Sequence, residues 1–285
     1  VYEQLFVRHW DTWSDGQRSQ IFVMPIAGGP AVSVMGGLVG DSPSKPFGGA
    51  EEIAWSKDGK TLFFALREAG RIEPLSTNLD IFSAPADGSA APTNLTDAND
   101  ATDTMPAVSP DGRRLAMVLS KAGSPDIWVG SSNGTGLRRL TTTKEAESSP
   151  CWSPDGRWIC FASRAGGGTK LYKIPANGGA MSRIRTIGVF NATEPDWSPD
   201  GKAIVFTTMR GGGVFEICIV PPAGGNVEVL ATGEDPSWAP NSRTLVFTSR
   251  SSKKRVLSVL DVPTKRVKNL PRSFPGNCSQ AAWTK

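Results

Sequence analysis

The sequence has 285 residues, of which 39% are hydrophobic and 20% charged, and its formal net charge is +4. No apolar run approaches the roughly 18 residues of a membrane-spanning helix, which excludes a span of that kind. The basic residues are scattered, apart from residues 253–255 and 265–268. Because nucleic-acid interfaces normally show a clustered basic patch, no nucleic-acid partner is expected.

The first 35 residues predict three short strands, at residues 4–7, 20–23 and 31–34, from their apolar and β-branched content. A turn rich in glycine, Pro25-Ile-Ala-Gly-Gly29, separates the second strand from the third. The first residue is Val rather than Met, so a processed or trimmed N-terminus is expected.

A turn that begins at Trp55-Ser-Lys-Asp-Gly59 then recurs at intervals of 41 to 53 residues. Its later copies are Val108-Ser-Pro-Asp-Gly112, Trp152-Ser-Pro-Asp-Gly156, Trp197-Ser-Pro-Asp-Gly201, Trp238-Ala-Pro-Asn-Ser242 and the incomplete Trp283-Thr-Lys285. Proline presets φ in such a turn, and glycine takes a positive φ. A period of about 40 to 50 residues indicates a solenoid, a propeller or an array.

One period predicts four strands. The first strand ends at Trp197. After the turn come the strand 203–208, a Gly-rich tip at 210–213, the strand 215–220, a turn at 222–225 and the strand 226–230. Four short antiparallel strands per period form a propeller blade.

We therefore predict an all-β fold, a six-bladed β-propeller of four-stranded antiparallel blades in a single domain over residues 1–285. The blades are expected at approximately 279–285 with 1–35, 51–96, 103–142, 147–187, 192–232 and 235–271. Residues 279–283 would supply the inner strand of the blade that begins at the N-terminus. The N- and C-terminal strands would then share one blade and close the ring, which removes exposed sheet edges.

No catalytic residue is predicted. The segment Gly130-Ser-Ser-Asn-Gly134 has the Gly-x-Ser-x-Gly pattern, but it falls in a hairpin turn, whereas a nucleophile elbow needs a strand-to-helix turn. The only histidine, His9, precedes it. With one histidine and no cysteine cluster, neither a zinc site nor a cofactor is expected.

The four cysteines do not form a metal or redox motif. Cys151 and Cys160 flank one turn and would lie on paired strands. Free buried thiols are the preferred interpretation, and a Cys151–Cys160 disulfide is the alternative.

We call the Trp or Val that begins each turn the repeat residue. Acidic residues precede it in five of the six predicted blades, and these are the candidate binding residues: Glu51, Glu52, Asp103, Glu147, Glu194, Glu234 and Asp235. The sixth blade offers Ser279 and Gln280 there. Because the loops that join successive blades meet at one mouth of the central channel, these acids could converge. They are either solvated loop residues or a funnel that attracts cations, basic side chains or a free amine.

The repeat resembles the PD40, TolB-like β-propeller repeat through nearly the whole chain. The resemblance rests on the Ser-Pro-Asp-Gly turns and on the third strands that begin Asp80-Ile-Phe and Asp126-Ile-Trp. It implies a periplasmic or secreted binding scaffold, although the N-terminal α/β domain of TolB has no counterpart here.

Residues 4 to about 116 resemble the propeller of S9, prolyl-oligopeptidase-type, serine peptidases. The segments that carry this likeness are 5–13, 43–49 and 76–80. The S9 catalytic residues have no counterpart in this sequence. The N-terminal half thus resembles S9 propellers, whereas the rest resembles TolB-type repeats. This difference suggests a chimaeric or engineered propeller, a recombinant product, because repeats with shared interfaces can be joined.

Three functions remain open. The first is a non-catalytic, monomeric scaffold that binds a peptide or protein at the acidic channel mouth. The second is the gating propeller of an S9 peptidase without its hydrolase domain. The third is a metal-dependent propeller hydrolase or lactonase, which would need converging oxygen ligands in the channel.

Overall fold

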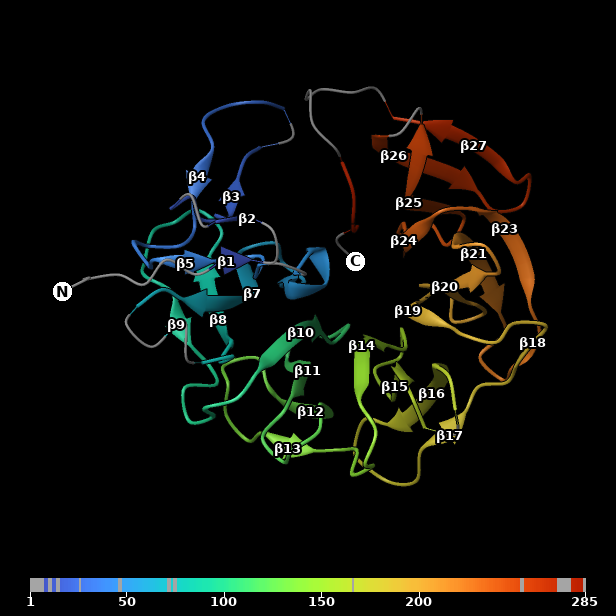
Figure 1. The fold of residues 1–285 in the computed structure, drawn as a ribbon, viewed down its shortest axis with the longest axis horizontal. Helices are drawn as coiled ribbons and strands as arrows, with labels where there is room; N and C mark the ends of the chain where they lie inside the picture. Colours follow the sequence, from blue (N-terminus) through green and yellow to red (C-terminus); the bar gives the residue numbers. More distant parts are fainter. Residues whose placement is uncertain are drawn as a thin grey trace.

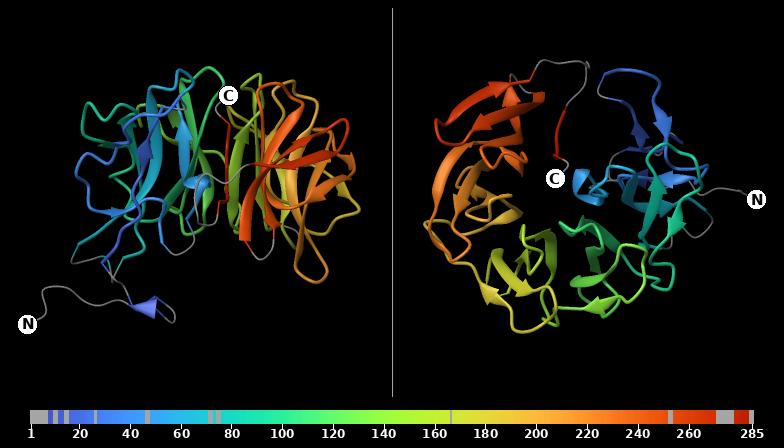
Figure 2. Two further views of the ribbon diagram at one scale, coloured as in Figure 1. Left: turned by 90° about the horizontal axis from the view of Figure 1, so that it is seen from above. Right: turned by 180° about the vertical axis from the view of Figure 1, so that it is seen from behind.

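The computed structural model describes residues 8–9, 12–13, 16–25, 27–45, 48–70, 73, 76–165, 167–251, 254–270 and 278–283. These residues form a ring of antiparallel β-sheets around a central axis, which is seen end-on in Figure 1 and from two other sides in Figure 2. The predicted all-β propeller is confirmed. One 3-10 helix, η1 (Ala50–Glu52), lies among the described residues, just before the strand β6.

Five blades follow one another around the ring. Blade I contains β5 (Gly40–Asp41), β6 (Ile53–Trp55), β7 (Thr61–Glu68), β8 (Asp80–Pro85) and β9 (Thr93–Asn94). Blade II contains β10 (Asp103–Val108), β11 (Arg114–Leu119), β12 (Asp126–Ser131) and β13 (Arg138–Arg139). Blade III contains β14 (Glu147–Trp152), β15 (Trp158–Ser163), β16 (Lys170–Pro175) and β17 (Ser182–Arg183).

Two further blades complete the series. Blade IV contains β19 (Thr193–Trp197), β20 (Ile204–Arg210), β21 (Val214–Val220) and β23 (Glu228–Thr232). Blade V contains β24 (Glu234–Trp238), β25 (Thr244–Ser251), β26 (Lys254–Asp261) and β27 (Arg266–Asn269). The remaining strands form two-stranded pairs: β1 (Arg8–His9) with β2 (Thr12–Trp13), β3 (Phe22–Val23) with β4 (Val32–Ser33), and β18 (Thr186–Ile187) with β22 (Gly225–Asn226).

The repeated Ser-x-Asp-Gly turn is held by its own side chains. In blade IV the Ser198 hydroxyl donates to Asp200 Oδ1 at 2.7 Å and accepts the backbone N–H of Ala203 at 2.9 Å. Gly201 follows with a φ of 76°, a conformation that glycine adopts without strain. The turns at Ser56, Ser109 and Ser153 repeat these hydrogen bonds. The sequence motif is therefore a local device that starts the second strand of each blade.

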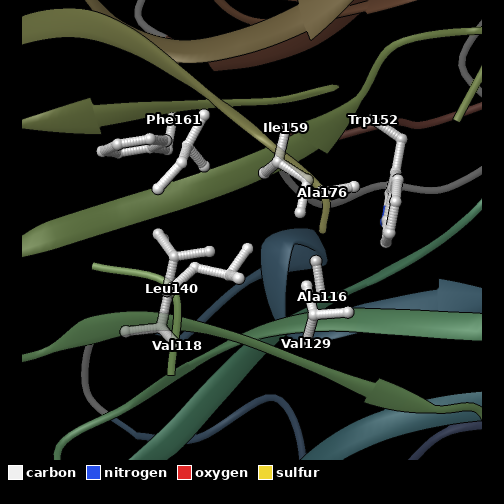
Figure 3. Packing of buried hydrophobic residues seen from close by; sticks show 10 residues of the cluster. Ala116, Val118, Val129, Leu140, Trp152, Ile159, Phe161 and Ala176 are labelled. Atoms are coloured by element: carbon white, nitrogen blue, oxygen red, sulfur yellow. The ribbon is translucent and has the colours of Figure 1, made fainter. Parts of the chain in front are cut away.

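Neighbouring blades are held together by side chains that pack between their faces. Trp152 at the end of β14 is 7% exposed and packs with Ala116 and Val129 of blade II (Figure 3). Its indole N–H donates to the carbonyl of Ala107 at 2.8 Å, and the guanidinium of Arg114 lies 4.7 Å from its ring centroid. Trp152 thus ties its own blade to the preceding one by both packing and hydrogen bonding.

The prediction of six blades is wrong, because the described residues form five. The N-terminal segment contributes only the hairpin β3–β4, whose strands have two residues each. Residues near this hairpin, among them Ile21 and Val34, pack against Leu62 and Phe64 of blade I. Residues 4–7, which were predicted to be a strand, lie outside the described residues.

The C-terminal residues 278–283 do not form the predicted inner strand. They run near the centre of the ring and form no β-ladder, although the N–H of Cys278 donates to the carbonyl of Arg255 at 3.1 Å (Figure 1). The N–H of Gln280 donates to Thr248 Oγ1 at 2.8 Å, and that of Trp283 donates to Ser237 Oγ at 3.3 Å. The described N-terminal hairpin offers no third strand for this segment to pair with, so the expected closed blade is absent from the described residues.

The cysteines are free thiols in this structure, as preferred from the sequence. Cys151 and Cys160 are opposite one another in the ladder between β14 and β15. Burial, followed by contact with Cys151, raises the pKa of Cys160 well above its ordinary value. Cys160 therefore stays a protonated, unreactive thiol at neutral pH.

We expect Trp152→Ala to lower the free energy of unfolding by about 3–5 kcal/mol, because the substitution leaves a cavity between two blades. Trp283→Ala is the matched control, since Trp283 occupies the same repeat position but is 42% exposed and lies outside any blade. It should cost about 1 kcal/mol or less. Urea unfolding of both variants measures the difference. Equal losses would mean that the C-terminal segment is packed like a blade.

Candidate functional site

The inner strands of blades II to V all bulge just before the repeat residue. In each of these inner strands, the ladder register shifts between the residue four positions before the repeat residue and the residue one position before it. The residue three positions before it has a left-handed φ of 53° to 55°: Met105, Ser149, Glu194 and Asp235. Gln280, three positions before Trp283, has a φ of 56°. Bulges re-aim side chains, and left-handed non-glycine residues are uncommon outside such features.

These left-handed residues are linked from one blade to the next. The N–H of Ser149 donates to the sulfur of Met105 at 3.2 Å, and the N–H of Asp235 donates to Glu194 Oε2 at 3.1 Å. Gln280 Oε1 accepts the N–H of Ala50 at 3.3 Å. The bulges therefore place the side chains of Met105 and Glu194 against the next inner strand, and that of Gln280 against η1.

Three of the seven candidate acids are buried: Asp103, Glu147 and Glu52. Asp103 and Glu147 lie five positions before the repeat residue and are 0% and 1% exposed. Glu147 accepts hydrogen bonds from the hydroxyls of Thr141 and Ser163 at 3.1 and 3.2 Å. Glu52 is also buried and accepts the N–H and the hydroxyl of Ser44 at 2.7 and 2.6 Å.

The other four acids form what we call the central cluster: Glu51, Glu194, Glu234 and Asp235. They come from η1 beside blade I, from blade IV and from blade V, so residues 51 and 235 are brought together by closure of the ring. Gln280 joins the cluster, because its amide Nε2 donates to Glu51 Oε2 at 3.3 Å.

The carboxylates of the central cluster are bound mainly by neutral donors. Thr207 Oγ1 donates to Glu194 at 2.6 Å, and Thr248 Oγ1 donates to Asp235 at 3.2 Å. The one ion pair formed by these four acids in the described residues joins Arg255 to Glu234, with 3.5 Å between Nε and Oε1. Negative charge therefore accumulates at the cluster without full compensation.

Burial and, after it, mutual repulsion raise the pKa of two acids of the central cluster. Burial, together with the nearby charges of Glu194, Glu234 and Glu51, raises the pKa of Asp235 to about 7. Burial also raises the pKa of Glu51, with contributions from Glu52 and Glu194. Like charges held together favour protonation or a bound cation.

Sequence reasoning missed the two threonines that orient Glu194 and Asp235. Thr207 and Thr248 occupy the same place in β20 and β25, each directly after a buried phenylalanine. The repeated Phe-Thr dipeptide could have indicated these two threonines in the sequence. A threonine in a strand is, however, ordinarily explained by its β-propensity.

The other polar features that the sequence drew attention to lie away from the central cluster. The Gly130–Gly134 segment ends β12 and forms a hairpin turn, in which Gly134 N–H donates to Ser131 O at 2.9 Å. Within the described residues there is no group of three or more His, Cys, Asp or Glu side chains that could hold a metal ion. Two shallow grooves, of about 420 and 330 Å³, share Arg114 and Asn177 at the turns of blades II and III, away from the central cluster.

A family model described as the TolB β-propeller domain, PD40, matches residues 89–285, which is more than half of the chain. The chain belongs to this family. Its propeller resembles the crystal structure of TolB from Acinetobacter baumannii, with a TM-score of 0.66 and 22% identity over 82% of this chain and 56% of that one. It also resembles a puromycin-hydrolyzing peptidase of Mycobacterium tuberculosis, with a TM-score of 0.65 and 18% identity over 94% of this chain and 45% of the peptidase. At these identities the likeness shows the fold alone.

Curated relatives of this PD40 protein include dipeptidyl-peptidase 5 of Trichophyton equinum, which is 34% identical over 133 residues. The dipeptidyl-peptidase 5 of Porphyromonas gingivalis is 30% identical over 122 residues. Each match covers 41% of this chain and 18% of the relative. The chain thus corresponds to a small part of these peptidases.

We expect Asp235→Asn to stabilise the protein most strongly above pH 7. The raised pKa means that between about pH 4 and 7 the folded protein keeps a proton that the unfolded chain has released, so stability falls as pH rises through this range. A rise from 3.8 to about 7 could change the free energy of unfolding by about 4 kcal/mol, which screening at this partly exposed site reduces to about 1–2 kcal/mol.

Urea unfolding of the parent and the Asp235→Asn variant from pH 4 to pH 8 tests this expectation. The stability gap between the two proteins should widen with pH and become constant above about pH 7. A gap that is the same at pH 4 and pH 8 would show that Asp235 titrates normally.

Proposed function

We propose that this PD40 propeller is a non-catalytic binding domain that receives a positively charged group of a peptide or protein at the central cluster. The observation that carries the proposal is that Glu51, Glu194 and Asp235 come from three parts of the ring and are held by neutral partners. Each is oriented by a hydrogen bond from Thr207, Thr248 or Gln280, so the carboxylates are fixed before a ligand arrives. Preorganised charge lowers the cost of binding.

The geometry favours a cationic ligand for an electrostatic reason. The pKa of Asp235 is raised first by burial and then by repulsion from the neighbouring acids. An ammonium or guanidinium group would relieve this repulsion and would gain charge-assisted hydrogen bonds. A free N-terminal amine, a lysine or an arginine side chain supplies such a group. A peptide is the natural carrier, because its backbone can also pair with the polar groups of the bulges.

We expect Glu194→Gln combined with Asp235→Asn to weaken binding of a basic peptide at least about tenfold, equivalent to about 1.4 kcal/mol. Fluorescence anisotropy with labelled Lys- and Arg-containing peptides, each compared with its Gln-substituted and N-acetylated form, measures the affinity and identifies the group that is bound. Binding should weaken as salt is raised, because the Debye length falls below about 8 Å above physiological ionic strength.

The control for this experiment is Glu228→Gln. Glu228 lies on the outer strand β23, is exposed and pairs with Lys265 at 2.8 Å, so it changes the net charge without touching the cluster. The double variant should lose binding while remaining at least as stable as the parent. If the double variant and the control bind equally well, or if no cationic peptide binds, the acids are only solvated residues.

A second candidate is that the chain is the propeller part of a larger S9-type peptidase. The observation that favours it is the 34% identity to a dipeptidyl-peptidase 5, of which the match covers only 18%. In such a protein the central cluster would receive the charged end of a peptide substrate. Sequencing the gene around this segment tests the idea: an α/β-hydrolase segment with a Gly-x-Ser-x-Gly motif should follow.

Three further expectations from the sequence remain predictions. They are a monomeric state, a periplasmic or secreted location, and a chimaeric origin. The metal-dependent hydrolase is the weakest alternative, since the described residues hold no cluster of three metal-ligating His, Cys, Asp or Glu side chains. No described helix is long and apolar enough to cross a membrane.

A further inference from the structure

A polar site recurs where the third and fourth strands of one blade meet the first strand of the next. At the junction of blades II and III it contains Asp126 and Glu147, both fully buried. Thr141 Oγ1 accepts the N–H of Ile127 at 2.8 Å and lies 3.3 Å from Asp126 and 3.1 Å from Glu147. Arg139 on β13 lies 2.7 Å from Asp126 Oδ2 and supplies the positive charge. Two buried carboxylates are thus compensated by one guanidinium.

The junction of blades I and II holds the same arrangement with one change. Asp80 takes the place of Asp126, Asp103 that of Glu147, and Thr96 that of Thr141, since Thr96 Oγ1 accepts the N–H of Ile81 at 3.0 Å. In the ladders, Asn94 is paired with Phe82 as Arg139 is paired with Trp128. The guanidinium of one junction is therefore replaced by a neutral amide at the other.

This replacement leaves two acids without a basic partner. Asp80 accepts the amide Nδ2 of Asn94 at 3.0 Å and that of Asn78 at 3.4 Å, and Asp103 Oδ1 accepts the amide of Asn99. Among the described residues no lysine or arginine nitrogen lies within ion-pair distance of either carboxylate.

The site also contains buried oxygens that nothing satisfies. Asp103 is 0% exposed, yet its Oδ2 has no hydrogen-bond partner among the described residues, and neither has the buried Oδ1 of Asn78. Burial, with the nearby charge of Asp80, raises the pKa of Asp103 to about 7. Buried carboxylates are stable only when a charge or a full set of hydrogen bonds compensates them.

We propose that the site formed by Asp80, Asp103, Asn78 and Asn99 binds a calcium ion between blades I and II. Carboxylate and amide oxygens are the ligands that calcium takes, six to eight at a time and with flexible geometry. The unsatisfied oxygens Asp103 Oδ2 and Asn78 Oδ1 are available as they stand. Rotation of the Asn99 amide by a half-turn would present its oxygen, since the two ends of an amide are nearly the same shape. The absence of His and Cys from this set disfavours zinc and other softer metals.

The calcium ion would take the structural role that Arg139 has at the next junction. It would compensate both acids and join the start of β8 to the start of β10. This role is independent of the central cluster, whose acids lie at the bulges rather than at the junction.

Thermal unfolding of the whole protein, first treated with EDTA and then titrated with calcium near pH 7.5, tests the proposal. The melting temperature should rise by about 5–10 °C at a calcium concentration about a hundred times Kd, because calcium binds only the folded state. Isothermal titration calorimetry should show one site, and magnesium should give a smaller shift, since it keeps its water shell more tightly.

Two variants at the site sharpen the test. Asp103→Asn should abolish the calcium response. Asn94→Arg installs the residue of the next junction, and should raise the melting temperature in EDTA while abolishing the response to calcium. Because Asn94→Arg is expected to be more stable than the parent without calcium, the test does not depend on a variant that fails to fold.

Two controls carry charge changes elsewhere. Asp126→Asn should lower the melting temperature but leave the calcium-induced shift unchanged. Glu194→Gln with Asp235→Asn should also leave the shift unchanged, which separates this site from the central cluster. The proposal is overturned if the parent shows neither a shift nor binding heat, or if the shift survives in both Asp103→Asn and Asn94→Arg. If the parent ignores calcium, and Asp103→Asn removes a loss of stability near pH 7 that persists in Asp235→Asn, Asp103 holds a proton instead and the proposal is overturned.

Discussion

The bulge before each repeat residue determines which side chains the blades share at the centre of the ring. In blades II to V it places one residue of the inner strand in the left-handed region. From there the side chains of Met105 and Glu194 accept hydrogen bonds from the bulge of the adjacent blade. The residue two positions earlier remains in the regular ladder and points into the sheet, as Asp103 and Glu147 do. An acid three positions before the tryptophan is thus available to a ligand, and one five positions before it belongs to the core.

The blades could be predicted from the sequence because their defining interactions are local. The serine, aspartate and glycine of each turn bond to one another within six residues, so the motif forms the same structure wherever it occurs. Closure of the ring could not be predicted in this way. It depends on whether residues nearly 280 positions apart can complete one ladder, and apolar content alone does not reveal that the described N-terminal strands are only two residues long.

The candidate site was predicted in part for a related reason. Counting acids near the repeat residue found Glu51, Glu194 and Asp235, but it grouped them with Asp103 and Glu147. A shift of one residue turns a strand side chain to the other face of the sheet. A bulge inserts one extra residue, so the number of residues before the tryptophan does not by itself tell which face an acid occupies. The proline that follows Met105, Ser149, Glu194 and Asp235 marks the bulge in the sequence. Reading from this proline would have separated central acids from buried ones.

Three successive junctions show how one position in the repeat can hold different charges. Asp126 at the second junction is matched by Arg139, whereas Lys170 replaces the aspartate at the third. There Ala192 stands where the next blade would place its acid, and the Lys170 ammonium is held by the carbonyl and the ring of Phe190. Burial lowers the pKa of Lys170, which is the opposite of the effect on Asp103. At the second junction a guanidinium, and at the third a backbone carbonyl and a ring, lie against the buried charge. At the junction of Asp80 with Asp103, no basic side chain among the described residues lies within ion-pair distance, and the proposed calcium ion would fill that role.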